Sequence, residues 1–134
     1  MKTITIKQPW VSLICEGIKD IENRTWSTKI RGRVLIHASQ KAIEMKYGNE
    51  IFTIEQWNYI TNKKSVLDKK CGCIIGSVEI VDCVINHPSI WAEKTNEFML
   101  QAGKPIYNWV LANPILFDKP IPAKGKLSFW NFDI

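Results

Sequence analysis

The longest β-type segment of this sequence covers residues 73–85, where isoleucine and valine recur with little interruption. A continuous apolar run of this length and composition predicts a buried strand. Shorter strand candidates accompany it: residues 3–7 alternate with period two, residues 32–38 place three apolar side chains on one side, and residues 107–132 alternate strand and turn. The fold therefore has to be built around a β-sheet.

Helical patterns fall between these strand candidates. Apolar side chains three to four residues apart predict a short helix over residues 10–14, and Gly17 is suited to end it. Residues 39–62 are the main helical part, with a break near Thr53, whose spacing from Gln56 matches a capping box. The apolar stripe of this part consists of Tyr47, Ile51, Ile54, Trp57 and Ile60. One or two further helical turns are expected within residues 90–101.

Short strands separated by turns, with helices inserted between them, predict an α+β domain built on a small barrel. The 134 residues are enough for a single domain, with boundaries 1–134. Apolar residues make up 46% and charged residues 23% of the chain, which excludes a disordered or fibrous protein.

The composition also bears on location and cofactors. The apolar stretches are far shorter than the roughly 20 residues that span a bilayer, and no secretory signal is visible, so we expect a cytoplasmic protein with reduced thiols. Cys71, Cys73, Cys83 and His87 form a C-x-C-x9-C-x3-H series. A single C-x-C lacks the geometry of a zinc knuckle, so we expect small buried thiols and no metal. No phosphate-binding glycine loop is present, and no cofactor is expected.

The net charge of +5 is modest, but its distribution is uneven. Arg24, Arg31 and Arg33 are the three arginines of the protein and lie within ten residues, with Lys19 and Lys29 close by. The guanidinium fork matches phosphate oxygens, so this cluster predicts a grip on a nucleic-acid backbone. The alternative is a solvated loop and an exposed strand face.

Six tryptophans are more than a chain of this length usually contains. Trp10 and Trp26 flank the segment around Lys19 and are candidates to stack on a base. The alternative for both is ordinary packing. The tryptophans expected in the core are Trp57, Trp109 and Trp130.

The segment that begins at Gly17 reads G-x-K-x-x-E-x-R, with Lys19, Glu22 and Arg24 as its charged members. In a regular strand Glu22 and Arg24 share a face and Lys19 points away. A turn after Gly17 would bring Lys19 back, and an ion pair of Glu22 with Lys19 or Arg24 would then shape a polar pocket. The pattern alone is weak, and from this segment alone paired charges on a surface strand are the better explanation.

Several ordered motifs together give the pattern more weight. They are residues 6–14, 17–26, 31–39, 72–76, 81–83 and 120–125, followed by Phe129 and Trp130. In this order they strongly resemble the ASCH domain family over nearly the whole chain. The resemblance implies a PUA-like fold, that is, a small mixed β-barrel with flanking helices and a cleft beside the first helix. It also implies binding of RNA or other nucleic acid, and some members are enzymes.

One enzyme branch of the family hydrolyses N4-acetylcytidine and another cleaves RNA. The first carries G-x-K-T-x-T-x-R, with the lysine and the second threonine catalytic and a later glutamate assisting. Lys19 and Arg24 match this pattern, but Glu22 occupies the position of the catalytic threonine, so the hydroxyl nucleophile is missing. Glu93 is the candidate for the later glutamate.

Two functions follow from these residues. In a nucleic-acid-binding module, Lys19, Arg24, Arg31 and Arg33 hold phosphates beside Glu22, Trp10 or Trp26 stacks on a base, and His37 and Ser39 bond a base edge or a ribose hydroxyl. For His37 a satisfied position inside the barrel is the alternative. In a hydrolase of RNA or a modified nucleoside, Lys19 donates a proton or stabilises charge and Glu22 activates water. A closed pocket around both side chains favours chemistry, and a shallow groove favours binding. A protein partner is a third possibility, without specific support.

Overall fold

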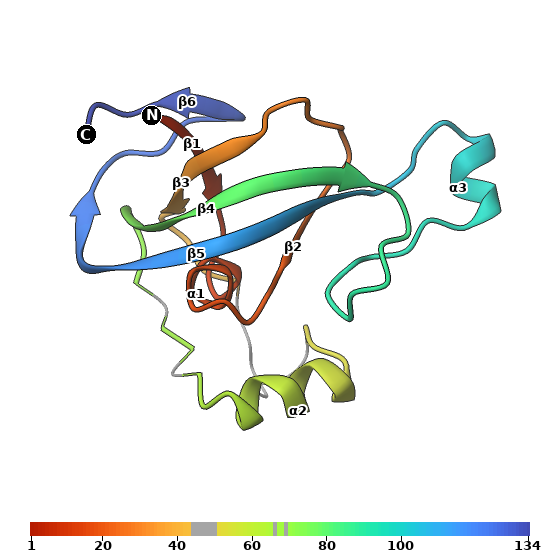
Figure 1. Cartoon of the computed structure of the whole chain (residues 1–134), viewed down its shortest axis with the longest axis horizontal. Helices are drawn as coiled ribbons and strands as arrows, with labels where there is room; N and C mark the ends of the chain where they lie inside the picture. Colours follow the sequence, from red (N-terminus) through yellow and green to blue (C-terminus); the bar gives the residue numbers. More distant parts are fainter. Residues whose placement is uncertain (44–50, 66, 69) are drawn as a thin grey trace.

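The computed structural model describes residues 1–43, 51–65, 67–68 and 70–134. The elements, in chain order, are β1 (Lys2–Ile6), α1 (Trp10–Cys15), β2 (Ile21–Arg24), β3 (Gly32–Ala38), α2 (Ile54–Asn62), β4 (Cys73–Val84), α3 (Glu97–Gln101), β5 (Tyr107–Pro122) and β6 (Phe129–Asn131) (Figure 1). Among the described residues, no helix is long and apolar enough to cross a membrane.

Six strands form one sheet in the order β2-β5-β4-β3-β1-β6. Strands β1 and β3 run parallel, and the other neighbouring pairs are antiparallel. The sheet curls, so that its edge strand β2 comes close to β1 although three strands separate them in the sheet. Arg24 of β2 donates a hydrogen bond to the Thr5 carbonyl of β1, at 3.1 Å. We call the place where β2 meets β1 the seam. The expected α+β class with a mixed, barrel-like sheet is confirmed, in the form of a curled half-barrel.

Helix α1 lies inside the curl of the sheet (Figure 1). It supplies Val11 and Ile14 to the apolar cluster that lines the sheet and Leu13 to a second cluster on its other side. The second cluster also contains Ile60 of α2 and Trp91 from the segment between β4 and α3. Burial of these side chains fixes α2 and that segment against α1, which places them around the start of the helix.

The main helix is shorter than the sequence predicts. The capping box is confirmed, because the Thr53 hydroxyl accepts a hydrogen bond from Gln56 N and the Gln56 side chain accepts one from Thr53 N. Helix α2 begins only after this cap, so Ile51 is out of phase with the stripe and Ile54 is 82% exposed. Tyr47, the first member of the predicted stripe, lies outside the described residues.

Strand β5 is one continuous strand in a region where the sequence predicts an alternation of strands and turns. Asn113 takes a positive φ of 51° before Pro114, but pairing with β4 continues through several register shifts. Bulges of this kind absorb an Asn-Pro step and bend the strand without ending it. The result is a long, bent pair of antiparallel strands, β4 and β5, which is visible in Figure 1.

The core positions are largely as expected. Trp109 and Trp130 are buried, whereas Trp57 is only half-buried and stacks on Phe52. Of the cysteines in the C-x-C-x9-C-x3-H series, Cys73 is buried and the other two are half-buried. No group of three or more potential metal ligands is gathered anywhere in the described part of the chain.

Candidate nucleic-acid interface

The turn after α1 is what brings Lys19 to the site. Gly17 follows the C-cap of the helix with a φ of +81°, a conformation that glycine adopts without steric cost. The next two backbone N–H groups, of Ile18 and Lys19, both donate to the Leu13 carbonyl, at 2.9 and 3.0 Å. The chain therefore reverses before β2 begins at Ile21, and the predicted turn is confirmed.

Three charged side chains of the motif form a linked ion-pair network. Glu22 Oε1 lies 3.8 Å from Lys19 Nζ, and Glu22 Oε2 accepts a hydrogen bond of 2.7 Å from Arg24 Nε. Lys19 Nζ also donates to the Ile21 carbonyl. Lys19 is 5% and Glu22 7% exposed, so both charges are almost out of solvent. The predicted pairing of Glu22 is confirmed, with both cations at once.

The environment of Lys19 disfavours its charge. Burial lowers the pKa of the ammonium below its ordinary value, and the neighbouring Arg24 lowers it further. Glu22, Glu93 and Asp20 oppose this change by raising the pKa. The ammonium also lies 5.2 Å from the centre of the Trp10 ring, in cation–π range.

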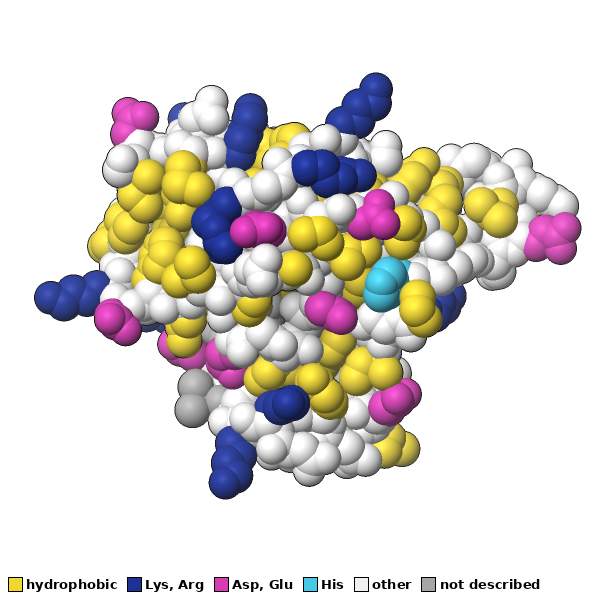
Figure 2. All heavy atoms as spheres, viewed as in Figure 1, with side chains coloured by type: hydrophobic (Ala, Val, Ile, Leu, Met, Phe, Trp, Pro, Cys, Tyr) yellow, Lys and Arg dark blue, Asp and Glu magenta, His cyan; other side chains and the backbone are white. Residues whose placement is uncertain are grey.

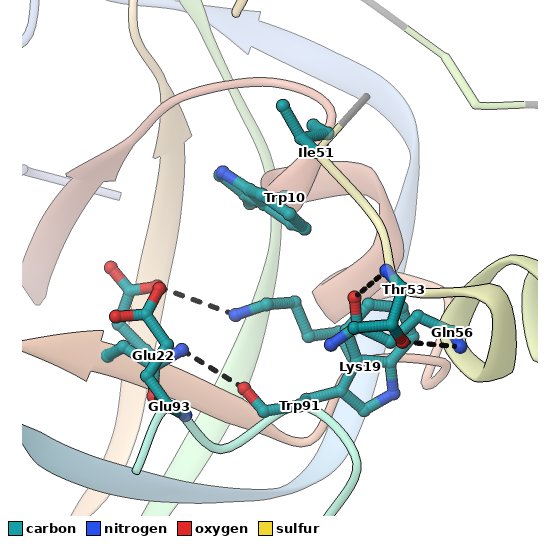
Figure 3. A pocket seen from close by; sticks show the side chains of 9 residues that line it. Trp10, Lys19, Glu22, Ile51, Thr53, Gln56, Trp91 and Glu93 are labelled. Atoms are coloured by element: carbon teal, nitrogen blue, oxygen red, sulfur yellow. Dashed lines mark hydrogen bonds and ion pairs between the residues drawn. The ribbon is translucent and has the colours of Figure 1, made fainter. Parts of the chain in front are cut away.

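A pocket of about 290 Å³ opens at this network. Its walls come from the start of α1, from β2, from the cap of α2 and from the segment after β4; they are Trp10, Lys19, Glu22, Asn23, Ile51, Thr53, Gln56, Trp91 and Glu93. Figure 3 shows Lys19 extending between Trp10 and Trp91 toward Glu22. The volume is near the lower limit for small-molecule pockets, about 300 Å³. The expected cleft beside the first helix is present.

Asn23 fixes the segment that closes one side of this pocket. Its side-chain N–H donates to the Trp91 carbonyl at 3.0 Å, and its oxygen accepts from Glu93 N at 3.0 Å and from Asn108 Nδ2 at 2.9 Å. The Glu93 side chain is exposed, and no hydrogen bond or ion pair within the described residues holds its carboxylate. The pocket thus offers one carboxylate that is free to accept from a ligand.

Arg24, Trp26 and Ser39 line a second hollow, on the seam side of Glu22. It measures about 430 Å³ and shares Glu22 and Asn23 with the first pocket. The Arg24 guanidinium lies 5.1 Å from the Trp26 ring centre, and Trp26 is 40% exposed. Ser39 is half-buried, and its hydroxyl donates to the Lys41 carbonyl. Part of the Trp26 side chain is therefore accessible from this hollow.

Arg31 and Arg33 are not part of either hollow. Arg33 donates to Ser77 Oγ, Glu79 Oε1 and the Asn113 carbonyl. It lies on β3 four residues before His37, which is about 13 Å along the strand. Arg31 bonds carbonyls of its own loop and lies 3.9 Å from Asp82. Alternation along β3 and its pairing with β4 separate these arginines from Arg24, so the sequence cluster is not one cluster in space. Figure 2 likewise shows Lys and Arg side chains spread over the viewed face.

The structure places His37 inside the barrel, in the satisfied position that was the alternative to contact with a base. His37 is 0% exposed, with Nε2 2.7 Å from the Ala123 carbonyl and Nδ1 3.2 Å from Thr5 Oγ1. The carbonyl only accepts, so Nε2 carries a proton. Trp130 Nε1 donates to Thr5 Oγ1 at 3.1 Å, and this leaves the Thr5 hydroxyl to donate to Nδ1 of the ring. Both ring nitrogens are thus used inside the protein.

Sequence reasoning missed several pocket residues. The sequence assigns no role in a site to four residues that line the pocket: Asn23, Thr53, Gln56 and Trp91. Asn23 lies inside the motif, and Thr53 and Gln56 are predicted only as a helix cap. A cap fixes where a helix begins, but only the packing of α2 on α1 shows that this end faces Lys19. Glu93, the candidate for the later glutamate of the enzyme branch, lines the pocket.

Comparison with known proteins gives a family match for this chain. The chain matches the ASCH domain over residues 4–121. It is 28% identical to human activating signal cointegrator 1 over 133 residues, which covers 97% of this chain and 22% of the human protein. The mouse protein of the same name is 28% identical over 139 residues, with the same coverage. The chain thus spans about a fifth of the length of these curated relatives.

Proposed function

Because this chain belongs to the ASCH domain family, we propose that it is a PUA-like RNA-binding domain that holds a single unpaired base in the pocket at Lys19. The observation that carries the proposal is the combination of walls in that pocket. Two tryptophans, Trp10 and Trp91, supply apolar surface for a ring, and a buried cation and carboxylates supply polar contacts. Unpaired bases are the part of RNA that such pockets recognise, through ring contacts and bonds to the base edge.

The polar groups of the pocket suit a base that has both donors and acceptors. Lys19 has three N–H donors and donates one of them to the Ile21 carbonyl, whereas its contact with Glu22 is an ion pair at 3.8 Å, so donors remain for a ring carbonyl. The Glu93 carboxylate accepts from an exocyclic amino group. A ligand without an acceptor at the position of the ring carbonyl would leave a donor of the buried Lys19 unpaired, at a cost of about 1–3 kcal/mol.

Fluorescence anisotropy with short single-stranded RNA, duplex RNA and single-stranded DNA tests the proposal. We expect single-stranded RNA to bind best, with log affinity falling against log salt by about 0.7 per phosphate contacted. Trp91→Ala and Glu93→Gln should weaken binding, whereas Arg33→Ala, a substitution at an arginine outside both hollows, should not. Equal binding by wild type and the two pocket variants would contradict the proposal.

A second function has a specific observation in its favour. Lys19 and Glu22 are almost buried in a partly enclosed pocket, which is the arrangement expected for chemistry, and the lowered pKa of Lys19 suits a proton donor. Both oxygens of Glu22 are held by cations, so in a hydrolase the unheld Glu93 carboxylate is the better base. On this proposal Glu93 takes a proton from the water that attacks the acyl carbonyl. Lys19 donates its own proton to the leaving nitrogen as the C–N bond breaks, and the proton on Glu93 then restores the Lys19 ammonium.

Incubation of the purified protein with N4-acetylcytidine tests this second function. The expected result is release of cytidine and acetate, lost in Glu93→Gln and retained in Glu97→Gln, which removes an exposed carboxylate on α3. No turnover by the wild type, or unchanged turnover by Glu93→Gln, would remove Glu93 from the chemistry and leave the binding function as the account of this pocket.

A further inference from the structure

The connection between β5 and β6 crosses the seam and carries exposed lysines near the site. Residues 123–128 present Lys124, Lys126 and Leu127 to solvent, and Leu127 is 95% exposed. We call residues 123–128 the seam turn. Lys7, at the end of β1, lies in the same region. In the described part of the chain no hydrogen bond or ion pair involves the ammonium groups of these three lysines.

The seam turn is held in place by buried groups. His37 Nε2 donates to the Ala123 carbonyl at 2.7 Å, and the same ring contacts Gly125 so closely that an added Cβ there would lie 2.7 Å from His37 Cε1. Thr5 Oγ1 would be 2.9 Å from the same Cβ. The backbone of this turn is therefore seated on a fully buried histidine, and its two lysines project from a fixed base.

The hollows along the seam adjoin the pocket at Lys19, with which they share wall residues. The second hollow shares Glu22 and Asn23 with that pocket. A third hollow, of about 330 Å³, is lined by the seam turn and shares Thr5, Ser39, Lys126 and Leu127 with the second. The second and third hollows thus lie one after the other between the Lys19 pocket and the seam turn, with Arg24 and Trp26 in the wall of the second. We call these two hollows the seam path.

The charge along this path has one sign. Among the described residues that line the second and third hollows, Glu22 is the single acidic side chain, and two cations already neutralise it. Lys7, Lys124 and Lys126 add free positive charge, and Trp26 and Leu127 add exposed apolar surface. Alternation of lysines with an aromatic ring is what a groove for single-stranded nucleic acid requires.

We propose that the seam path is the track for the RNA backbone, with Lys7, Lys124 and Lys126 contacting phosphates on one side of the nucleotide whose base enters the pocket. This inference rests on the proposed RNA-binding function and assigns the phosphate contacts to the seam turn, in place of Arg31 and Arg33. Leu127 and Trp26 contact the ribose or base of the neighbouring nucleotides. His37 and Gly125 act as positioning residues for the two lysines.

The test is the salt dependence of binding by Lys124→Ala/Lys126→Ala, compared with Lys63→Ala/Lys64→Ala. The control removes the same charge at the end of α2, on exposed residues that line none of these hollows. With a fluorescent single-stranded RNA, the seam-turn variant should bind more weakly at low salt, and its slope of log affinity against log salt should be shallower than that of wild type by about 1.4, for two lost phosphate contacts. The control should keep the wild-type slope.

Each result separates the two levels of the proposal. If the control and the seam-turn variant behave alike while Glu93→Gln still weakens binding, the track is wrong and the pocket stands. If the wild type binds no RNA, both are overturned. NMR shift mapping with unlabelled RNA gives a second measurement: amides of residues 124–128 should move on titration, and unchanged amides there would also contradict the track.

Discussion

Glu22→Gln removes the one negative charge that lies between two partly or wholly buried cations. The substitution keeps the size of the side chain and an oxygen for Arg24, so it changes charge and little else. Lys19 is 5% exposed, and after the change no carboxylate of the described residues lies within ion-pair distance of it. Breaking a buried pair from one side costs about 3–5 kcal/mol, because the remaining charge is left uncompensated. We expect a loss of about 3 kcal/mol, since Gln retains part of the hydrogen bonding.

Glu79→Gln is the matched control for this prediction. It breaks the pair of Glu79 with Arg33 at 3.2 Å, but those side chains are 36% and 29% exposed. Partly exposed pairs contribute at most about 1 kcal/mol. In urea denaturation, with a slope of about 1–3 kcal/mol per molar, the Glu22 variant should lose on the order of 1–3 M in midpoint and the control only a fraction of that. Equal losses would refute the argument that burial of Lys19 makes Glu22 necessary.

The pH dependence of the same pair of variants provides an internal check. Burial lowers the pKa of Lys19 in the folded protein, so the unfolded chain binds its proton more tightly, and the stability of the folded state rises as pH increases through the lowered pKa toward 10.5. Glu22 raises that pKa, so its removal lowers it further. Once Lys19 is neutral it needs no counter-ion, and the cost of Glu22→Gln should therefore shrink at alkaline pH.

Three further predictions concern neighbouring features. Gly17→Ala should destabilise the fold by about 1–2 kcal/mol in thermal or urea unfolding, because its φ is +81° and the new Cβ would lie 3.2 Å from Pro114; an unchanged midpoint would contradict the turn. RNA affinity should fall as pH rises, already below the pKa of ordinary lysines, because Lys19 with its lowered pKa loses its charge first. Lys19→Arg should remove that fall, as anisotropy titrations across pH can show. Burial raises the pKa of Cys15 to about 12, so iodoacetamide at pH 8 should leave Cys15 unmodified in the native protein and label it in urea; labelling without urea would be contrary to its burial.

Local patterns in the sequence predict the framework well. Strand β3 has the predicted bounds, β4 differs by one residue at its end, and the turn at Gly17 and the cap at Thr53 are present as expected. Each depends on a short stretch of chain whose backbone preference no distant contact overrides. The bent strand β5 was missed because pairing with β4 outweighs the local tendency of Asn113 and Pro114 to end a strand.

The site was predicted only in part, because closeness in sequence is a poor guide to closeness in space. Lys19, Glu22 and Arg24 meet through one turn, which the sequence allowed to be anticipated. Arg31 and Arg33 are equally near in sequence, yet the pairing of β3 with β4 takes them elsewhere. The lysines of the seam turn are about a hundred residues away from the motif, and only the curl of the sheet brings them to it.

Ultraviolet cross-linking of the protein to a short single-stranded RNA, with the linked peptides mapped by mass spectrometry, tests the central claim most directly. The account predicts cross-links at the pocket, in the peptides that contain Trp10 and Trp91, and at residues 124–128 of the seam turn. Cross-links centred on residues 31–33, with none in those peptides, would contradict it.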